Sequence, residues 1–100
     1  MMISVNIIKS YRDVIAVCDS NLLGKVFEED QFQLDLKESF YKGEEVSEKE
    51  AVDMLENMLA EDATFNIVGK ESVKVALKAG IIKEEGIGKI AGIPFALVLL

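Results

Sequence analysis

Residues 47–62, Ser-Glu-Lys-Glu-Ala-Val-Asp-Met-Leu-Glu-Asn-Met-Leu-Ala-Glu-Asp, carry the clearest structural signal in the chain. Ser47 and Glu50 have the spacing of a capping box, in which each side chain accepts a hydrogen bond from the backbone N–H of the other residue at the start of a helix. The following residues place apolar side chains on one helical face: Ala51, Val52, Met54, Leu55, Met58 and Leu59. We therefore predict an amphipathic helix that ends near Asp62 and packs against a core.

Segments on both sides of this helix alternate or cluster apolar residues as β-strands do. Alternation at residues 3–7, a turn at 10–13 and an apolar run at 14–18 predict an N-terminal hairpin. Further strands are predicted at 26–27, 32–36, 64–68, 87–90 and 95–100, and residues 40–44 are interpreted as a strand end and a turn. The last strand is apolar throughout, so we expect it inside the sheet or at a subunit interface.

Two shorter signals complete the pattern. We expect Asp19-Ser20-Asn21 to cap a single helical turn through Leu22-Leu23 that ends at Gly24, and a second helix to begin after Gly69 and end at Gly80. The whole chain, residues 1–100, is therefore predicted to form one α+β domain. Its expected architecture is a mixed β-sheet of about five or six strands with two amphipathic helices packed on it.

The composition limits the kinds of catalytic site and the cellular location that the protein can have. Cys18 is the only cysteine and the chain contains no histidine, which excludes an internal disulfide and every catalytic pair that needs an imidazole. The first residues lack the basic start of a signal peptide, and the apolar run at 90–100 has about half of the ~20 residues that a membrane helix needs. We therefore expect a cytoplasmic protein without a membrane segment.

Charge is unevenly distributed along the sequence. The net charge is −7, yet the segment from Glu28 to Asp62 alone carries thirteen acidic residues against three lysines. On the predicted first helix, Glu50, Asp53 and Glu56 lie opposite the apolar face. We interpret this acidic face as a solvated surface, with docking of a basic partner as the alternative.

Lysines recur at helical spacing on the second predicted helix. Lys70, Lys74 and Lys78 follow one another every four residues and would line one side of it. This lysine stripe is interpreted as a solvated face, and contact with an anion or with RNA is the functional alternative. The net charge of the chain disfavours binding to nucleic acid.

Three motif-like stretches lack the context that their chemistry requires. Gly86–Ala91 has the letters of a dinucleotide-binding loop, but Gly92 and Pro94 follow where a helix should begin. Gly69-Lys70 lacks the remainder of a phosphate-binding loop, and residues 19–24 lack a calcium loop's third ligand. We therefore expect no cofactor, no metal and no catalytic residue at these positions, and a buried, inert thiol at Cys18.

Four segments, in their order and spacing, resemble the archaeal domain of unknown function family 424. They are Ala16-Val17-Cys18-Asp19, Leu22-Leu23-Gly24-Lys25-Val26-Phe27-Glu28, Asn66-Ile67-Val68-Gly69-Lys70 and Ile90-Ala91-Gly92-Ile93-Pro94. The resemblance spans nearly the whole chain and implies an archaeal cytosolic α+β protein, with no established activity and no catalytic residue to carry over. Asn66 and Gly69, in the third of these segments, are predicted to form a functional loop. The resemblance also suggests an association with translation genes.

Three functional hypotheses follow from these observations. The leading one is a non-enzymatic interaction module with a protein partner, associated with translation. The second is RNA binding through the lysine stripe, and the third is a small enzyme with a carboxylate or lysine site in a cleft that the sequence does not reveal. The sequence leaves the partner and the oligomeric state open.

Overall fold

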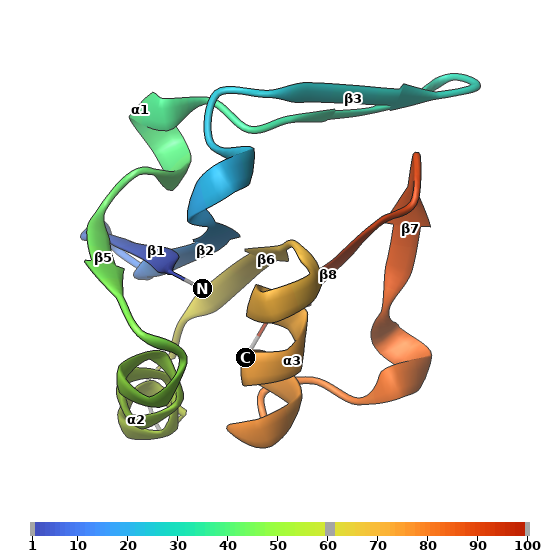
Figure 1. The fold of residues 1–100 in the computed structure, drawn as a ribbon. Coiled ribbons are helices and arrows are strands. Elements are labelled where there is room, and N and C mark those ends of the chain that lie inside the picture. The colour runs from blue at the N-terminus through green and yellow to red at the C-terminus, as the bar shows by residue number, and fades with distance from the viewer. Residues whose placement is uncertain (1, 60–61, 100) are drawn as a thin grey trace.

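We describe the fold from a computed structural model, in which residues 2–59 and 62–99 are described. Six strands form a mixed sheet in the order β5-β1-β2-β6-β8-β7, and two more form a separate hairpin (Figure 1). The strands of the sheet are β1 (Ile3–Ile8), β2 (Val14–Asp19), β5 (Glu44–Val46), β6 (Thr64–Val68), β7 (Gly88–Ile90) and β8 (Ile93–Leu99); the hairpin consists of β3 (Val26–Glu29) and β4 (Phe32–Asp35). The helices are α1 (Glu38–Tyr41), α2 (Glu48–Met58) and α3 (Lys70–Lys78), and short 3₁₀ turns lie at Ser20–Leu22 and Glu84–Gly86. The α+β class, the mixed sheet and the two amphipathic helices α2 and α3 are confirmed.

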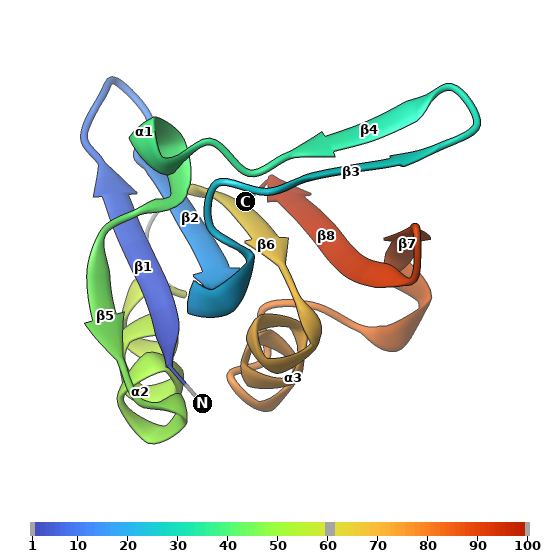
Figure 2. The same cartoon turned by 45° about the horizontal axis from the view of Figure 1, so that its top comes forward.

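The order and direction of the strands bring the ends of β2 and β6 and the start of β8 to the same end of the sheet. β1 and β2 form the predicted antiparallel hairpin, and β2 then pairs in parallel with β6, with Cys18 opposite Val68. Because β2 and β6 are parallel, both leave the sheet at the same end (Figure 2). β8 pairs antiparallel with the other side of β6, so the start of β8 also lies at this end.

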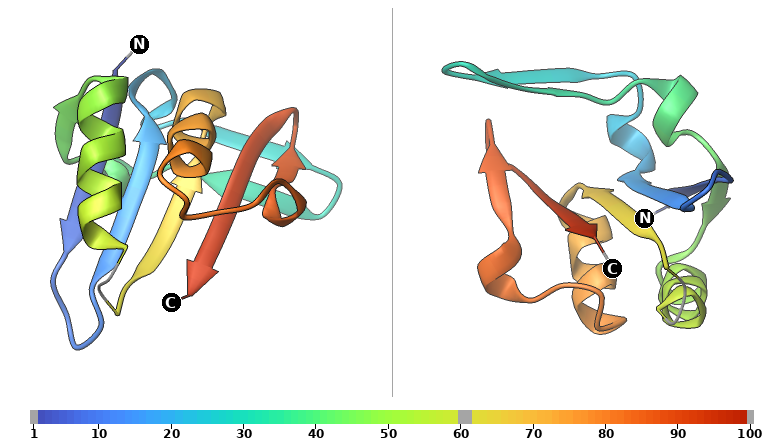
Figure 3. Two further views of the ribbon diagram at one scale, coloured as in Figure 1. Left: turned by 90° about the horizontal axis from the view of Figure 1, so that it is seen from below. Right: turned by 180° about the vertical axis from the view of Figure 1, so that it is seen from behind.

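Helices α2 and α3 cover one face of the sheet (Figure 3, left). Leu55 of α2, Val75 of α3 and Phe65 of β6 are fully buried in the core between these layers. The capping box of α2 is confirmed: the Glu50 N–H donates to Ser47 Oγ at 3.2 Å, and the Ser47 N–H donates to Glu50 Oε1 at 3.2 Å. The helix itself ends at Met58, earlier than predicted, and residues 60–61 of the expected segment lie outside the described residues.

The opposite face is covered only in part, by α1 and the β3–β4 hairpin (Figure 1). A second, smaller core lies there around Cys18, Leu36 and Val68, with Tyr41 and Phe95 packed against it. The predicted strand at 32–36 is confirmed at β4. The hairpin extends beyond the sheet, as Figure 2 shows.

The prediction for residues 40–44 is wrong, because Glu38–Tyr41 form a short helix. Side chains from β1 stabilise it by donating hydrogen bonds to its carbonyl groups: Ser4 Oγ to Tyr41 O at 3.1 Å and Asn6 Nδ2 to Phe40 O at 2.7 Å. The Gly43 N–H donates in turn to Ser4 Oγ at 2.7 Å. These partners are more than thirty residues away in sequence, so the local pattern of residues 40–44 carries no sign of them.

Leu59, predicted on the apolar face of α2, is 41% exposed, because the helix has ended at Met58.

None of the described helices has the length and the apolar character that crossing a membrane requires.

Candidate functional site

A cavity of about 560 Å³ opens at the end of the sheet where β2 and β6 both terminate. In open α/β sheets, ligands commonly bind in crevices at the carboxyl ends of parallel strands, and β2 and β6 are such a parallel pair. Three chain segments supply its walls: the end of β2 with the turn after it, the start of α3, and β7 with the turn into β8. The lining residues are Asp19, Asn21, Leu22, Lys70, Glu71, Lys89, Gly92, Ile93 and Pro94.

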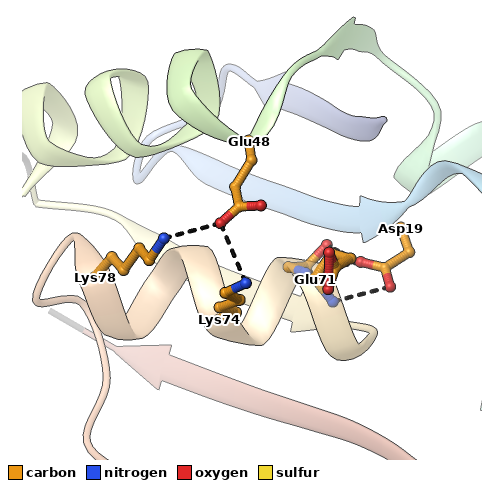
Figure 4. A network of polar contacts seen from close by, with 6 residues as sticks. Asp19, Glu48, Glu71, Lys74 and Lys78 are labelled. Carbon is orange, nitrogen blue, oxygen red and sulfur yellow. Dashed lines mark hydrogen bonds and ion pairs between the residues drawn. The ribbon is translucent and has the colours of Figure 1, made fainter. Parts of the chain in front are cut away.

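Asp19 caps α3 from the neighbouring strand. Its Oδ1 accepts hydrogen bonds from the N–H and the Oγ of Ser72, each at 2.7 Å. Its Oδ2 accepts from the Glu71 N–H at 3.1 Å (Figure 4). The side chain is almost fully buried, and these donors compensate its charge at the positive end of the helix. The predicted single turn is present at Ser20–Leu22, but the predicted capping by Asp19-Ser20-Asn21 is wrong, because that turn has no side-chain cap and Asp19 caps α3 instead.

Gly69 allows this cap because it brings the start of α3 against Asp19. Its φ is +113°, and an added Cβ would lie 2.3 Å from the carboxyl carbon of Asp19, so no other residue fits here. The Gly69 N–H donates to Pro94 O at 2.9 Å, which ties β8 to the same point. Gly69, Asp19 and Pro94 thus fix the three walls of the cavity to one another.

Asn66, predicted with Gly69 in a functional loop, lies instead in the middle of β6 and is half-buried. Its register partners are Ala16 of β2 and Leu97 of β8. Since Phe65 and Ile67 on either side of it face the helix-covered core, its side chain faces the opposite side of the sheet. The prediction of a loop is wrong for Asn66, because the strand continues through it to Val68.

The lysine stripe divides into two unequal parts. Lys74 and Lys78 both point toward Glu48 of α2, with Nζ–Oε1 distances of 3.7 and 3.0 Å (Figure 4). The hydrogen bond from Lys78, together with the charge of Lys74, lowers the pKa of Glu48. Lys70 lies one turn earlier, at the cavity, so the structure brings only one of the three lysines to it.

A second lysine reaches the cavity from a different element. Lys89 belongs to β7 and lies outside the predicted lysine stripe; among residues 2–59 and 62–99, neither it nor Lys70 takes part in an ion pair. Both side chains are exposed. No regular spacing in the sequence links the two positions, because only the pairing of β7 with β8 brings Lys89 to this end of the sheet.

The acidic face of α2 is separate from the cavity. Glu50, Asp53 and Glu56 are exposed on α2, and none of the three lines the cavity. Glu48 of the same helix points instead toward α3.

Cys18 is fully buried in the smaller core, and burial raises the pKa of its thiol to about 12. A thiol with this pKa stays protonated at neutral pH, in line with the inert role predicted for it. The segment Gly86–Ala91 runs from the last residue of the 3₁₀ turn through the short strand β7 and is followed by β8, so a strand stands where a dinucleotide loop requires a helix. Within the described part of the chain, no group of three His, Cys, Asp or Glu side chains is arranged to hold a metal.

A family model described as a protein of unknown function, DUF424, matches residues 8–100. The chain belongs to the DUF424 family. Its fold is similar to the crystal structure of an uncharacterized conserved protein from Methanopyrus kandleri, with a TM-score of 0.87 and 25% identity. That similarity covers 98% of this chain and 90% of the other. No curated protein matches the sequence at a significant level.

The segments on which the resemblance to this family rests meet at the cavity. Asp19 and Leu22 come from the first two segments, Lys70 from the third, and Gly92-Ile93-Pro94 from the last. The sequence separates these segments by up to about seventy residues, from Asp19 to Ile90, and the pairing of β2, β6 and β8 brings them together. The sequence does offer one signal, because a predicted strand, residues 14–18 or residues 64–68, precedes each of Asp19 and Gly69.

Proposed function

We propose that this DUF424 protein is a non-enzymatic interaction module that binds a carboxylate group of a partner protein in the cavity beside the start of α3. The observation that carries the proposal is the meeting of Lys70 and Lys89, two lysines without ion-pair partners among the described residues, at one cavity. On a chain with a net charge of −7, two such cations from separate elements favour a local anion site.

The balance of charges around the cavity supports an anionic ligand. Asp19 also lines it, but three hydrogen-bond donors and the end of α3 compensate its carboxylate. Of the remaining charged side chains, Lys70 and Lys89 outnumber Glu71. Leu22, Ile93 and Pro94 add apolar walls, which give a partner chain area to bury beside its charged group.

The chemistry of the site favours binding over catalysis. Both oxygens of Asp19 accept hydrogen bonds from the start of α3, so this carboxylate has a structural role at the cavity. Cys18 is closed off by burial and keeps its proton. The alternative of a small enzyme would have to rely on Glu71 with Lys70 and Lys89, and no observation favours it further.

Two of the three lysines required for RNA binding already have a partner. Lys74 and Lys78 share Glu48, which leaves Lys70 and Lys89 for contacts to phosphate. Two contacts to single-stranded RNA correspond to a log–log salt slope of about −1.4, at about −0.7 per contact. This is a small electrostatic contribution for an acidic chain, and we therefore favour a protein partner.

The acidic face of Glu50, Asp53 and Glu56 stays a predicted contact for a basic partner, and association with translation stays a prediction of the family resemblance. Neither is needed for the cavity to bind a carboxylate. A partner from the translation apparatus with a basic surface and an acidic chain segment would suit both surfaces.

A titration followed by amide NMR tests the proposal. A short peptide rich in Asp and Glu with a free carboxyl terminus is expected to shift the amide signals of Lys70, Glu71, Gly92 and Ile93 in the parent protein. The pair of substitutions Lys70→Gln and Lys89→Gln should abolish these shifts. Lys74→Gln with Lys78→Gln is the matched control, because it removes the same amount of charge from lysines that lie away from the cavity and should leave the shifts intact.

Shifts confined to α2, or equal shifts in both double variants, would contradict a carboxylate site at the cavity. A single-stranded RNA that produces the same shifts at lower concentration than the peptide would replace the protein partner by RNA.

A further inference from the structure

The outer edge of β8 is paired over only part of its length. β7 pairs with Ile93, Pro94 and Phe95, and the chain before β7 turns away into the 3₁₀ turn at Glu84–Gly86. The residues of β8 from Ala96 to Leu99 therefore pair with β6 on one side and with no described strand on the other (Figure 3, left).

The register fixes which backbone groups point to this free edge. The Gly69 N–H donates to Pro94 O, so Pro94, Ala96 and Val98 direct their backbone groups toward β6. By alternation, Leu97 and Leu99 direct their N–H and C=O groups outward. Exposed groups of this kind form a template for another strand.

The side chains on this edge are apolar and exposed. Leu97 and Leu99 are 62% and 70% exposed, on the face of the sheet that α2 and α3 do not cover. The strand from Ile93 to Leu99 contains no charged residue, and its one proline, Pro94, lies in the part that β7 already covers. Charges and prolines are the usual means by which an edge strand avoids pairing, and the free part of β8 has neither.

We propose that the free edge of β8 pairs antiparallel with the same edge of a second copy of this chain. A two-fold axis midway between Val98 and Val98 of the copy places Leu97 opposite Leu99 of the copy and Leu99 opposite Leu97, so each outward N–H meets an outward C=O. The leucines then form cross-strand pairs on the uncovered face. Such pairing closes after two chains, which removes the edge without forming a fibre.

The distribution of charge favours a second copy as the occupant. The acidic strand β5 lies at the opposite edge of the sheet from β8 and β7. The acidic helix α2 packs beside β1, toward that same edge. In the paired sheet β5 and α2 lie at the outer ends, while the acidic β3–β4 hairpin, which contacts β7, lies nearer the seam. The paired segments from Ala96 to Leu99 carry no charge, so the two chains meet along uncharged strands.

Sedimentation equilibrium of the parent chain and of three variants tests the proposal. The parent should have twice the chain mass of 11.0 kDa. Leu97→Pro removes an outward N–H that β6 does not use and Leu97→Lys adds a charge to the free edge, and both should give a folded protein of single-chain mass. Phe32→Lys is the control, because Phe32 is 60% exposed on the β3–β4 hairpin, and this variant should keep the doubled mass.

Amide hydrogen exchange gives a second readout that does not depend on the variants. Pairing should slow exchange at Leu97 and Leu99 in the parent as the protein concentration rises. A single-chain mass for the parent at every concentration, with fast exchange at both leucines, would overturn the proposal. A doubled mass that both Leu97 variants retain would overturn it as well, because another surface would then hold the copies together.

Discussion

Helices α2 and α3 lie side by side on the same face of the sheet, yet they begin in different ways. α2 is capped by its own residues, Ser47 and Glu50, which are three positions apart. α3 has no side-chain cap of its own and is capped by Asp19, which lies more than fifty residues earlier in β2. A helix cap made by neighbouring residues can be predicted from the sequence, whereas a cap supplied by a strand exists only after the sheet has formed. The candidate site lies at the start of α3, the helix that is capped from a distant strand.

The largest effect is expected from Asp19→Ala. The substitution leaves the N–H groups of Glu71 and Ser72 and the hydroxyl of Ser72 without an acceptor. At about 1–3 kcal/mol for each buried donor left unsatisfied, we expect a loss of roughly 3 kcal/mol or more in the free energy of unfolding. Denaturant titration measures it, and a loss below that of Ser47→Ala would contradict the importance of the remote cap.

A smaller effect is expected from Ser47→Ala, which removes the local cap of α2. Loss of an N-cap serine typically costs about 1 kcal/mol, and the exposed position of this cap allows water to replace part of it. The shift of the urea midpoint gives the value. Ser47→Asp is the control, since aspartate also caps helices and should restore most of the stability.

The smallest effect concerns Glu48, which joins the two helices through Lys74 and Lys78. Its pKa is lowered in the folded protein, so the ion pairs stabilise the fold above the ordinary pKa of 4.5 and are lost as the pH falls through the folded value. Parent and Glu48→Gln should therefore differ in stability at neutral pH and converge in acid. A difference between them that is independent of pH would show that Glu48 acts through packing rather than through its charge.

The parts of the fold that the sequence predicted correctly are those determined by neighbouring residues. The hairpin of β1 and β2, the capping box and the strand β6 all rest on periodicity or on contacts within a few residues. The parts that it missed depend on distant partners. α1 relies on Ser4 and Asn6 of β1, and the cap of α3 relies on Asp19.

The candidate site shows the same division. The stripe of Lys70, Lys74 and Lys78 was visible as a helical repeat, but Glu48 of another helix takes two of its members away from the site. Lys89 takes part in the site through strand pairing alone, and no local pattern marks it. Contacts between residues far apart in sequence therefore determine which lysines reach the cavity. Such a contact, from Asp19, also determines where α3 begins beside it.

The most direct test of this account is hydrogen exchange at individual backbone amides, in the parent protein and in Asp19→Asn. The variant keeps the size of the side chain but removes its charge and one of its two acceptor oxygens. We expect faster exchange at Glu71 and Ser72, at the start of α3, and unchanged exchange at Glu50, at the start of α2. Equal exchange at Glu71 and Ser72 in the two proteins would contradict the claim that a residue of β2 holds the start of α3 and the wall of the cavity.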